Sequence, residues 1–251
     1  MSSDLDNKPA IYYQGIREEM LRFIPEDAGT VLEVGCGGGN FGYRLKQRGA
    51  RQVWGVEIVE AAGEKAQKLL DKVLIGDVAA LIDQLPEAYF DFIVFNDVLE
   101  HMVDPYDVLN RIKSKISPNG VVVSSIPNIR YYWTFRELLV YGEWEYEESG
   151  ILDSTHLRFF TAKSILRMYD RLGYEVLRHE GINPITQQPR IYRLANLLLR
   201  RRLSDMLYIE FVSVAKPLTT ERSVDETRAA GARLLAGIRG QTVKNPGPHP
   251  R

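Results

Sequence analysis

Short runs of apolar, mostly β-branched residues alternate with helix-like stretches along the first half of the chain, and this alternation most restricts the possible folds. The expected strands cover residues 30–34, 52–56, 73–75, 92–95 and 121–126. The expected helices between them cover residues 41–47, 59–70, 78–85 and 105–116. Because apolar strands joined by helices form parallel sheets covered on both faces, the pattern predicts a doubly wound α/β sheet.

The second half of the chain adds two strands to this pattern. A helix is expected at 162–172, a sixth strand at 174–181 and a seventh strand at 206–215. A parallel strand needs a crossover helix before it, and none fits directly before the seventh strand, so we expect that strand to run antiparallel beside the sixth. The prediction is a Rossmann-like, seven-stranded, mostly parallel sheet with lid insertions after strands 5 and 6.

The same pattern of expected strands and helices divides the chain into three parts. We expect a helical segment at 1–27, since the apolar residues of 10–24 have helix-like spacing and Pro25 follows. The main domain is expected at 28–216, with inserts at 128–160 and 184–203. Residues 217–251 form a polar tail, with a short helix around 225–238.

A glycine-rich stretch follows the first expected strand, in the sequence VLEVGCGGGNFG. Gly35, Gly37 and Gly39 allow the backbone to turn sharply and to approach a ligand closely. The loop leads into a helix whose first amides point toward that ligand. Glu33, just before the loop, would repel a pyrophosphate and suits a cationic or amine-bearing ligand.

A dinucleotide site is the competing interpretation of this loop. Gly37, Gly39 and Gly42 satisfy the G-x-G-x-x-G pattern, which is weak evidence alone. Glu57, at the end of the second strand, could bind a ribose in either kind of site. Glu33 argues against a dinucleotide, and Asp77 with Val78 supplies an acid and an apolar neighbour where an adenine ring would lie.

At these positions the sequence resembles the class I S-adenosylmethionine-dependent methyltransferases, over residues 28–180. The residues that carry the resemblance are Glu33-x-Gly35-x-Gly37-x-Gly39, Glu57, Asp77 and Asn96–Asp97–Val98–Leu99–Glu100–His101. The resemblance implies S-adenosyl-L-methionine as the cofactor and methyl transfer as the activity.

The resemblance also implies roles for individual residues. Glu33 and the glycine loop would hold the methionine part of the cofactor, and Glu57 would bind both ribose hydroxyls. Asp77 would accept a hydrogen bond from the adenine amino group, while Val78 packs on the ring. Asn96 would line the methionine and substrate side.

Two later stretches narrow the resemblance. Leu99–Glu100–His101, followed by Asp104–Pro105, is similar to the branch that contains ubiquinone-pathway O-methyltransferases and many sugar and small-molecule methyltransferases. Residues 153–161 resemble, more loosely, bacterial members linked to surface-polysaccharide and secondary-metabolite clusters. Together they imply O-methylation of a small-molecule or sugar-type hydroxyl.

His101 and His156 are the candidate catalytic bases. A neutral imidazole can accept a hydroxyl proton near pH 7; the alternative is that each histidine fixes a loop through its hydrogen bonds. Asp97, Glu100 and His101 have i, i+3, i+4 spacing, and the corresponding residues of ubiquinone-pathway enzymes are associated with a divalent metal. Asp97 replaces a glutamate of that pattern and shortens its reach, so we assign no metal ligand here.

The two expected inserts leave several interpretations open. The aromatic residues of 131–146 could form the core of a small lid, stack on a planar or sugar substrate, or make a homodimer contact. Residues 190–202 contain five arginines interleaved with leucines. They could form an ordinary surface helix with its leucines inward, a contact with an anionic membrane surface, or a clamp on a phosphate-bearing substrate.

Composition sets the remaining limits. The 251 residues carry a formal charge of −1, so no overall basic field favours nucleic acid. The single cysteine, Cys36, cannot form an internal disulfide, which fits a reducing compartment. We find no transmembrane run and no signal-peptide pattern, and expect a cytoplasmic protein. An N-methyltransferase acting on a small amine, an NAD-dependent enzyme and a non-catalytic cofactor-binding partner remain alternatives.

Overall fold

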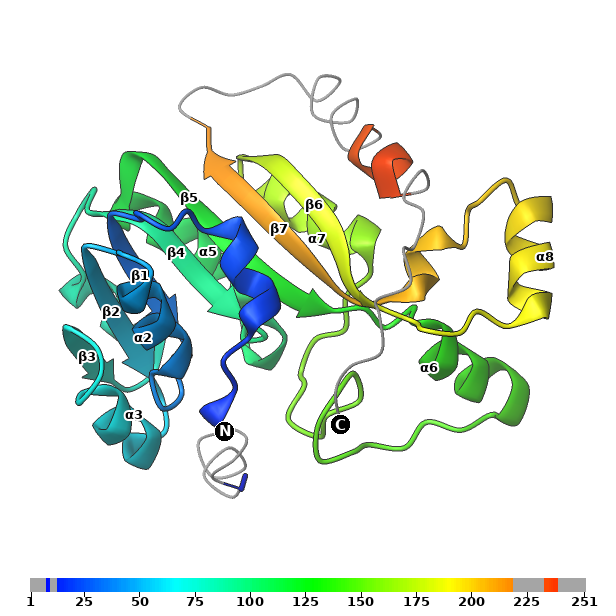
Figure 1. The fold of residues 1–251 in the computed structure, drawn as a ribbon, viewed down its shortest axis with the longest axis horizontal. Helices are drawn as coiled ribbons and strands as arrows, with labels where there is room; N and C mark the ends of the chain where they lie inside the picture. Colours follow the sequence, from blue (N-terminus) through cyan, green and yellow to red (C-terminus); the bar gives the residue numbers. More distant parts are fainter. Residues whose placement is uncertain (1–7, 10–12, 219–232, 239–251) are drawn as a thin grey trace.

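One seven-stranded sheet forms the centre of the computed structural model, which describes residues 8–9, 13–218 and 233–238 (Figure 1). The strand order is β3-β2-β1-β4-β5-β7-β6, and only β7 runs antiparallel to its neighbours. The strands are β1 (Thr30–Val34), β2 (Gln52–Glu57), β3 (Lys72–Ile75), β4 (Phe90–Asn96), β5 (Ile116–Pro127), β6 (Tyr174–Pro184) and β7 (Tyr208–Pro217). The predicted fold class and the antiparallel seventh strand are confirmed.

Helices connect most of these strands. The α-helices are α2 (Asn40–Gln47), α3 (Glu60–Ala66), α4 (Val78–Leu81), α5 (Pro105–Arg111), α6 (Tyr132–Arg136), α7 (Ala162–Arg171) and α8 (Arg190–Leu198). Short 3₁₀ helices cover Glu18–Phe23, Ile82–Gln84, Leu99–His101, Ile112–Lys115 and Ser204–Leu207, and a π-helical turn covers Glu137–Tyr141. Residues 233–238 are also helical, and the rest of the expected helix at 225–238 lies outside the described residues.

Two separate apolar cores cover the two faces of the sheet. Phe41 and Leu45 of α2 belong to one core, together with residues of the 3₁₀ helix Glu18–Phe23. Leu109 of α5 and Met168 of α7 belong to the other core. Burial on both faces is why the central strands are almost continuously apolar.

The order of strands in the sheet predicts where a ligand would bind. β1 lies between β2 and β4, so the chain leaves β1 toward one edge of the sheet and later returns to its other side. In doubly wound sheets this reversal opens a crevice at the carboxyl ends of the strands, where ligands bind. The glycine-rich loop after β1 and the residues after β4 therefore meet at one crevice.

The expected helix at 10–24 is wrong as a single element. Within the described part of that stretch, residues 15–17 are not helical, and Arg17 has a φ of 52°. The 3₁₀ helix begins only at Glu18. The left-handed backbone at Arg17 turns its side chain toward the sheet, where two carboxylates bind it.

Several element boundaries also differ from the prediction. β5 begins at Ile116, because Ile116 already pairs with Phe90 of β4. The register then shifts before Val121 pairs with Phe92. Residues 117–120, which separate the expected helix from the expected strand, therefore form an irregularity within β5. α3 ends at Ala66 and α5 at Arg111, both shorter than expected.

The two inserts contact each other at one end of the molecule. α6 follows β5, α8 follows β6, and the rings of Tyr132 and Tyr192 lie 5.5 Å apart (Figure 1). Within the described residues, none of the helices has the length and apolarity to cross a bilayer.

Candidate active site

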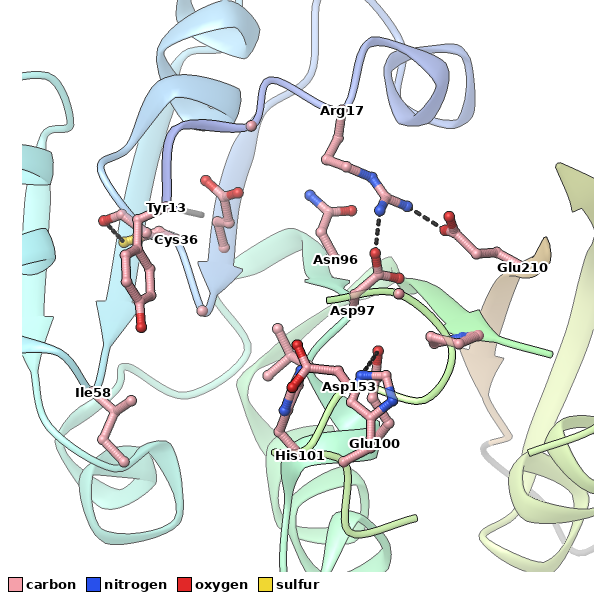
Figure 2. Close-up of a pocket in the computed structure, with 18 of the residues that line it drawn as sticks. Tyr13, Arg17, Cys36, Ile58, Asn96, Asp97, Glu100, His101, Asp153 and Glu210 are labelled. Atoms are coloured by element: carbon pink, nitrogen blue, oxygen red, sulfur yellow. Dashed lines mark hydrogen bonds and ion pairs between the residues drawn. The ribbon is translucent and has the colours of Figure 1, made fainter. Parts of the chain in front are cut away.

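A cavity of about 390 Å³ lies at the carboxyl ends of the central strands (Figure 2). Its wall comes from the N-terminal segment, the ends of β1, β2 and β4, the returning part of the first insert, and the start of β7. The residues that line the cavity include Tyr13, Arg17, Glu33, Gly35, Gly37, Glu57, Asn96, Asp97, Glu100, His101, Ile151, Asp153, His156 and Glu210. Its volume lies within the range of small-molecule and cofactor sites.

The glycine-rich loop has the backbone that its sequence predicted. Gly35, Gly37 and Gly39 have φ values of 70°, 53° and 82°, in the region that favours glycine. A Cβ atom on Gly37 would lie 2.9 Å from the carbonyl oxygen of Tyr13. The N-terminal segment therefore packs directly on this loop, and the Gly38 amide donates to the same carbonyl at 2.9 Å.

Glu57, at the end of β2, binds the backbone of the glycine-rich loop. Its carboxylate accepts hydrogen bonds from the amides of Gly37 at 2.7 Å and Val59 at 2.9 Å. Only 4% of the residue is exposed, and burial raises the pKa of its carboxyl. Each carboxylate oxygen has a second lone pair, so two hydroxyl donors can still bind here.

Glu33 lies on β1 below the loop and lines the same cavity. Its carboxylate accepts from the Gly42 amide at 3.1 Å, and burial raises its pKa to about 8. Among the described residues, no lysine, arginine or histidine forms an ion pair with Glu33 or Glu57. A buried carboxylate without a cation nearby is costly, so a cationic ligand would relieve this cost.

The other expected cofactor contacts lie in different places. Asn96 lines the cavity at the end of β4. Asp77 and Val78 are not part of the cavity wall: Asp77 caps α4 by accepting from the Ala79 amide at 2.9 Å, and Val78 is buried in the core. Cys36 also lines the cavity, and burial raises the pKa of its thiol, which disfavours a nucleophilic thiolate.

Arg17 forms a buried ion-pair cluster that sequence reasoning missed. Its guanidinium contacts the carboxylate of Asp97 and, at 2.5 Å, that of Glu210 on β7 (Figure 2). Ser125 donates to the second oxygen of Asp97 at 2.7 Å. Burial, followed by the Asp97 charge, raises the pKa of Glu210 to about 7. No local pattern predicts this cluster, because Arg17 lies 80 residues from Asp97 and 193 from Glu210.

The two candidate histidines meet at the opposite side of the cavity. The imidazole rings of His101 and His156 are 4.6 Å apart. His101 Nδ1 lies 3.2 Å from the Thr155 carbonyl oxygen, and His156 Nδ1 lies 3.0 Å from the Ile151 carbonyl oxygen. Because a carbonyl can only accept, both Nδ1 atoms carry protons, which leaves each Nε2 as an acceptor in the neutral ring.

Burial keeps both histidines neutral. It lowers the pKa of His101 to about 4 and lowers that of His156 below its ordinary value. Glu100 lies beside them, with its Oε1 3.9 Å from His156 Nε2. It is only 1% exposed, and neither of its carboxylate oxygens has a hydrogen-bond partner among the described residues. Burial, followed by the Asp97 charge, raises the pKa of Glu100 well above its ordinary value.

These three side chains form a possible cation site. Glu100, His101 and His156 each offer one ligand atom, and those atoms lie within 4.8 Å of one another. The set differs from the one with i, i+3, i+4 spacing, because Asp97 points to Arg17 and His156 takes its place beside Glu100.

Asp153 organises the insert that carries His156. Its carboxylate accepts from the amide and the hydroxyl of Thr155, at 2.8 and 2.7 Å, and from Lys8 at 2.8 Å. Thr155 Oγ1 in turn accepts from His101 Nδ1 at 3.0 Å. The Asp153 carboxylate therefore reaches His101, through Thr155, and not His156.

The remaining parts of the inserts do not reach the cavity. The aromatic residues of 131–146 are not on its wall, so stacking on a substrate there has no support in the structure. The helix at 190–198 also lies off the wall, which removes support for a clamp on a bound phosphate. Its leucines were expected to face inward as in an ordinary surface helix, but Leu194, Leu197 and Leu198 are 60–72% exposed.

Comparison with known proteins agrees with this geometry. The family described as "Methyltransferase domain" matches residues 10–179. Curated relatives include a ubiquinone biosynthesis O-methyltransferase of Chromobacterium violaceum, 32% identical over 195 residues that cover 70% of this chain and 78% of that protein. A protein of the same name from Pseudomonas paraeruginosa is 33% identical over 190 residues, with the same coverage of both chains.

Solved structures show the same fold. A SAM-dependent methyltransferase from Archaeoglobus fulgidus superimposes with a TM-score of 0.57 at 19% identity, covering 83% of this chain and 94% of that one. A possible histamine N-methyltransferase from Thermotoga maritima gives a TM-score of 0.56 at 18% identity, with coverage of 82% and 89%.

Proposed function

The chain belongs to the class I S-adenosylmethionine-dependent methyltransferases, and on that premise we propose that it methylates a hydroxyl oxygen of a small-molecule acceptor. The observation that carries this proposal is the pair of imidazole Nε2 acceptors of His101 and His156, side by side on the cavity wall. A hydroxyl must lose its proton as it takes a methyl group, and a neutral amine needs less help from a base.

The cofactor end of the cavity is formed by the glycine loop, Glu33 and Glu57. Glu57 offers two free lone pairs, which suits a pair of ribose hydroxyls. Glu33 is a buried carboxylate without a cation, which suits the positive charge of the methionine part. When bound, S-adenosylmethionine supplies an activated methyl group for direct displacement by the acceptor atom.

The histidines are the proposed proton acceptors. Their lowered pKa values keep the Nε2 lone pairs free at neutral pH, and their Nδ1 atoms are held by backbone carbonyls. A positioned base contributes at most about 10²–10⁴-fold to the rate, and less where its pKa lies well below the working pH, as for His101.

A divalent cation is an alternative way to activate the same hydroxyl. Glu100, His101 and His156 would hold the ion, which would favour the ionised form of a bound hydroxyl. Either way, Tyr13, Arg17 and Ile151 would exclude water from the reacting atoms, because they close the cavity from the N-terminal segment and the first insert.

The test combines histidine variants with a set of acceptors. We expect turnover of phenolic or sugar hydroxyls, with His101→Ala and His156→Ala each lowering kcat by at most about 10²–10⁴-fold. Cofactor affinity measured by calorimetry should stay within about twofold. Trp133→Ala is the matched control, since this half-exposed ring lies off the cavity wall and should leave kcat unchanged.

Three outcomes separate the alternatives. Full turnover by both histidine variants would refute the assigned base. Turnover of amines alone would refute O-methylation while leaving the family assignment intact. Loss of activity with EDTA, restored by a single added divalent ion, would show that the histidines act as metal ligands.

A further inference from the structure

Helix α8 presents an apolar face to solvent. Ile191, Leu194, Leu197 and Leu198 are 74%, 60%, 70% and 72% exposed. At about 100° per residue, these four positions fall within an arc of about 120° on the helix surface. A continuous aliphatic stripe of this kind normally faces a protein core, and here it faces outward.

The opposite face of α8 explains this orientation. Tyr192 is 3% exposed, and its hydroxyl donates to the Leu203 carbonyl oxygen at 2.7 Å. Asn196 accepts from the Leu203 amide at 2.9 Å. The helix cannot roll its leucines inward without breaking these hydrogen bonds, so the apolar face is held outward by the fold.

Five arginines lie on α8 or directly after it. They are all exposed, and the segment 184–203 contains no aspartate or glutamate. In the part of the chain that the structure describes, none of the five forms an ion pair; they are Arg190, Arg193, Arg200, Arg201 and Arg202. The surface therefore combines exposed aliphatic side chains with uncompensated positive charge.

The first insert also exposes apolar side chains. Leu139, Val140 and Tyr141 of the π-helical turn are 71%, 65% and 54% exposed. This turn continues α6, which contacts α8 through Tyr132 and Tyr192, and both inserts lie at the same end of the molecule (Figure 1).

We propose that the exposed face of α8, with the arginines on and directly after this helix, docks on the surface of an anionic lipid bilayer. The leucines of α8 would enter the boundary between headgroups and acyl chains, and the arginines would contact lipid phosphates. A second copy of the chain is less favourable in this place, because a two-fold contact through α8 would bring the same arginines together. The proposal does not depend on the identity of the methyl acceptor.

Sedimentation with lipid vesicles tests this proposal on the full chain. We expect at least tenfold stronger partitioning to vesicles of 70% phosphatidylcholine and 30% phosphatidylglycerol than to phosphatidylcholine alone. Added salt at about 0.5 M should reduce the difference, because it screens the arginines.

Two variants separate the apolar and the charged contributions. Leu194→Glu with Leu198→Glu should lower partitioning to the anionic vesicles at least tenfold. Arg200→Gln, Arg201→Gln and Arg202→Gln together should remove most of the preference for anionic lipid. The matched controls are Leu177→Glu, an exposed leucine on β6, and the triple change Lys163→Gln, Arg167→Gln and Arg171→Gln on α7; both should bind like the wild type.

Cofactor binding and light scattering complete the test. Each variant should keep the cofactor affinity of the wild type, which shows that it folds. Equal partitioning of the wild type to neutral and anionic vesicles, or no partitioning, would overturn the proposal. A dimer in solution that Leu194→Glu dissociates, with no vesicle binding, would identify a second copy as the occupant and overturn it as well.

Discussion

Two pairs of carboxylates on the cavity wall differ in how their charge is balanced. Asp97 and Glu210 share the guanidinium of Arg17, which reaches them from the N-terminal segment. Glu33 and Glu57 accept hydrogen bonds but have no cation as partner among the described residues, and burial raises the pKa of both. The difference indicates that the fold supplies the cation on one side and leaves it to the ligand on the other.

The largest expected effect concerns the pH dependence of cofactor binding through Glu33. Its carboxyl has a pKa of about 8 in the free protein, and a bound cation would lower that pKa. Affinity should therefore level off above pH 8 and should fall by up to about tenfold for each pH unit between pH 8 and pH 6. Calorimetry at several pH values measures this slope.

Glu33→Gln is the control for that experiment. It should bind more weakly at pH 8 and show no such slope, because the amide does not titrate. Calorimetry at pH 7 in two buffers of different ionisation enthalpy should show proton release for the wild type only. A wild-type affinity that does not change between pH 6 and pH 8 would exclude Glu33 as the partner of the cofactor's charge.

The next effect concerns Arg17, whose removal would leave Asp97 and Glu210 without a cation, as Glu33 and Glu57 are. Arg17→Met leaves Asp97 and Glu210 without a cation and should cost about 1–3 kcal/mol of unfolding free energy. Glu210, whose pKa of about 7 exceeds its ordinary 4.5, binds more protons folded than unfolded. Its contribution to stability is therefore present below pH 4.5 and is lost as pH rises toward 7.

Denaturation at two pH values tests this dependence of stability on the protonation of Glu210. The loss of unfolding free energy in Arg17→Met should be larger at pH 8 than at pH 5, since protonation relieves the unpaired carboxyls. Arg44→Met is a matched control, because its pair with Glu18 is exposed. An equal loss at both pH values would show that Arg17 acts through packing alone.

Glu57 should show a smaller effect, confined to binding. Glu57→Ala removes the proposed contact with two ribose hydroxyls and should weaken cofactor affinity at least tenfold, about 1.4 kcal/mol. Glu60→Ala, an exposed acid at the start of α3, is the control and should bind normally. Unchanged affinity of Glu57→Ala would count against the ribose assignment.

The smallest effect separates the two roles of Asp77. Asp77 caps α4, so the Asp77→Ala variant should lose about 1 kcal/mol of unfolding free energy and the Asp77→Asn variant should lose little. If Asp77 also binds adenine, both variants should weaken cofactor affinity several-fold. Normal affinity in both variants would leave Asp77 as a cap alone, as it stands in this structure.

Much of the cofactor end could be predicted from the sequence because its signals are local. These signals lie within 25 residues of one another: Glu33 on the first strand, the glycines at positive φ, and Glu57 at the end of the second strand. The strands and the turn between them fix how these residues are arranged. The catalytic end depends on contacts across the fold, since His101 and His156 come from different loops.

The sheet, the glycine loop and the acids near the strand ends follow from the order of residues along the chain, because periodicity and turn chemistry act between neighbouring residues. The partners of Arg17 and the pairing of the two histidines follow from the folded chain, since strand order brings distant residues together. The tertiary structure also decided which face of α8 points outward. Helical spacing shows which residues share a face, but the hydrogen bonds of Tyr192 and Asn196 selected the face that packs on the protein.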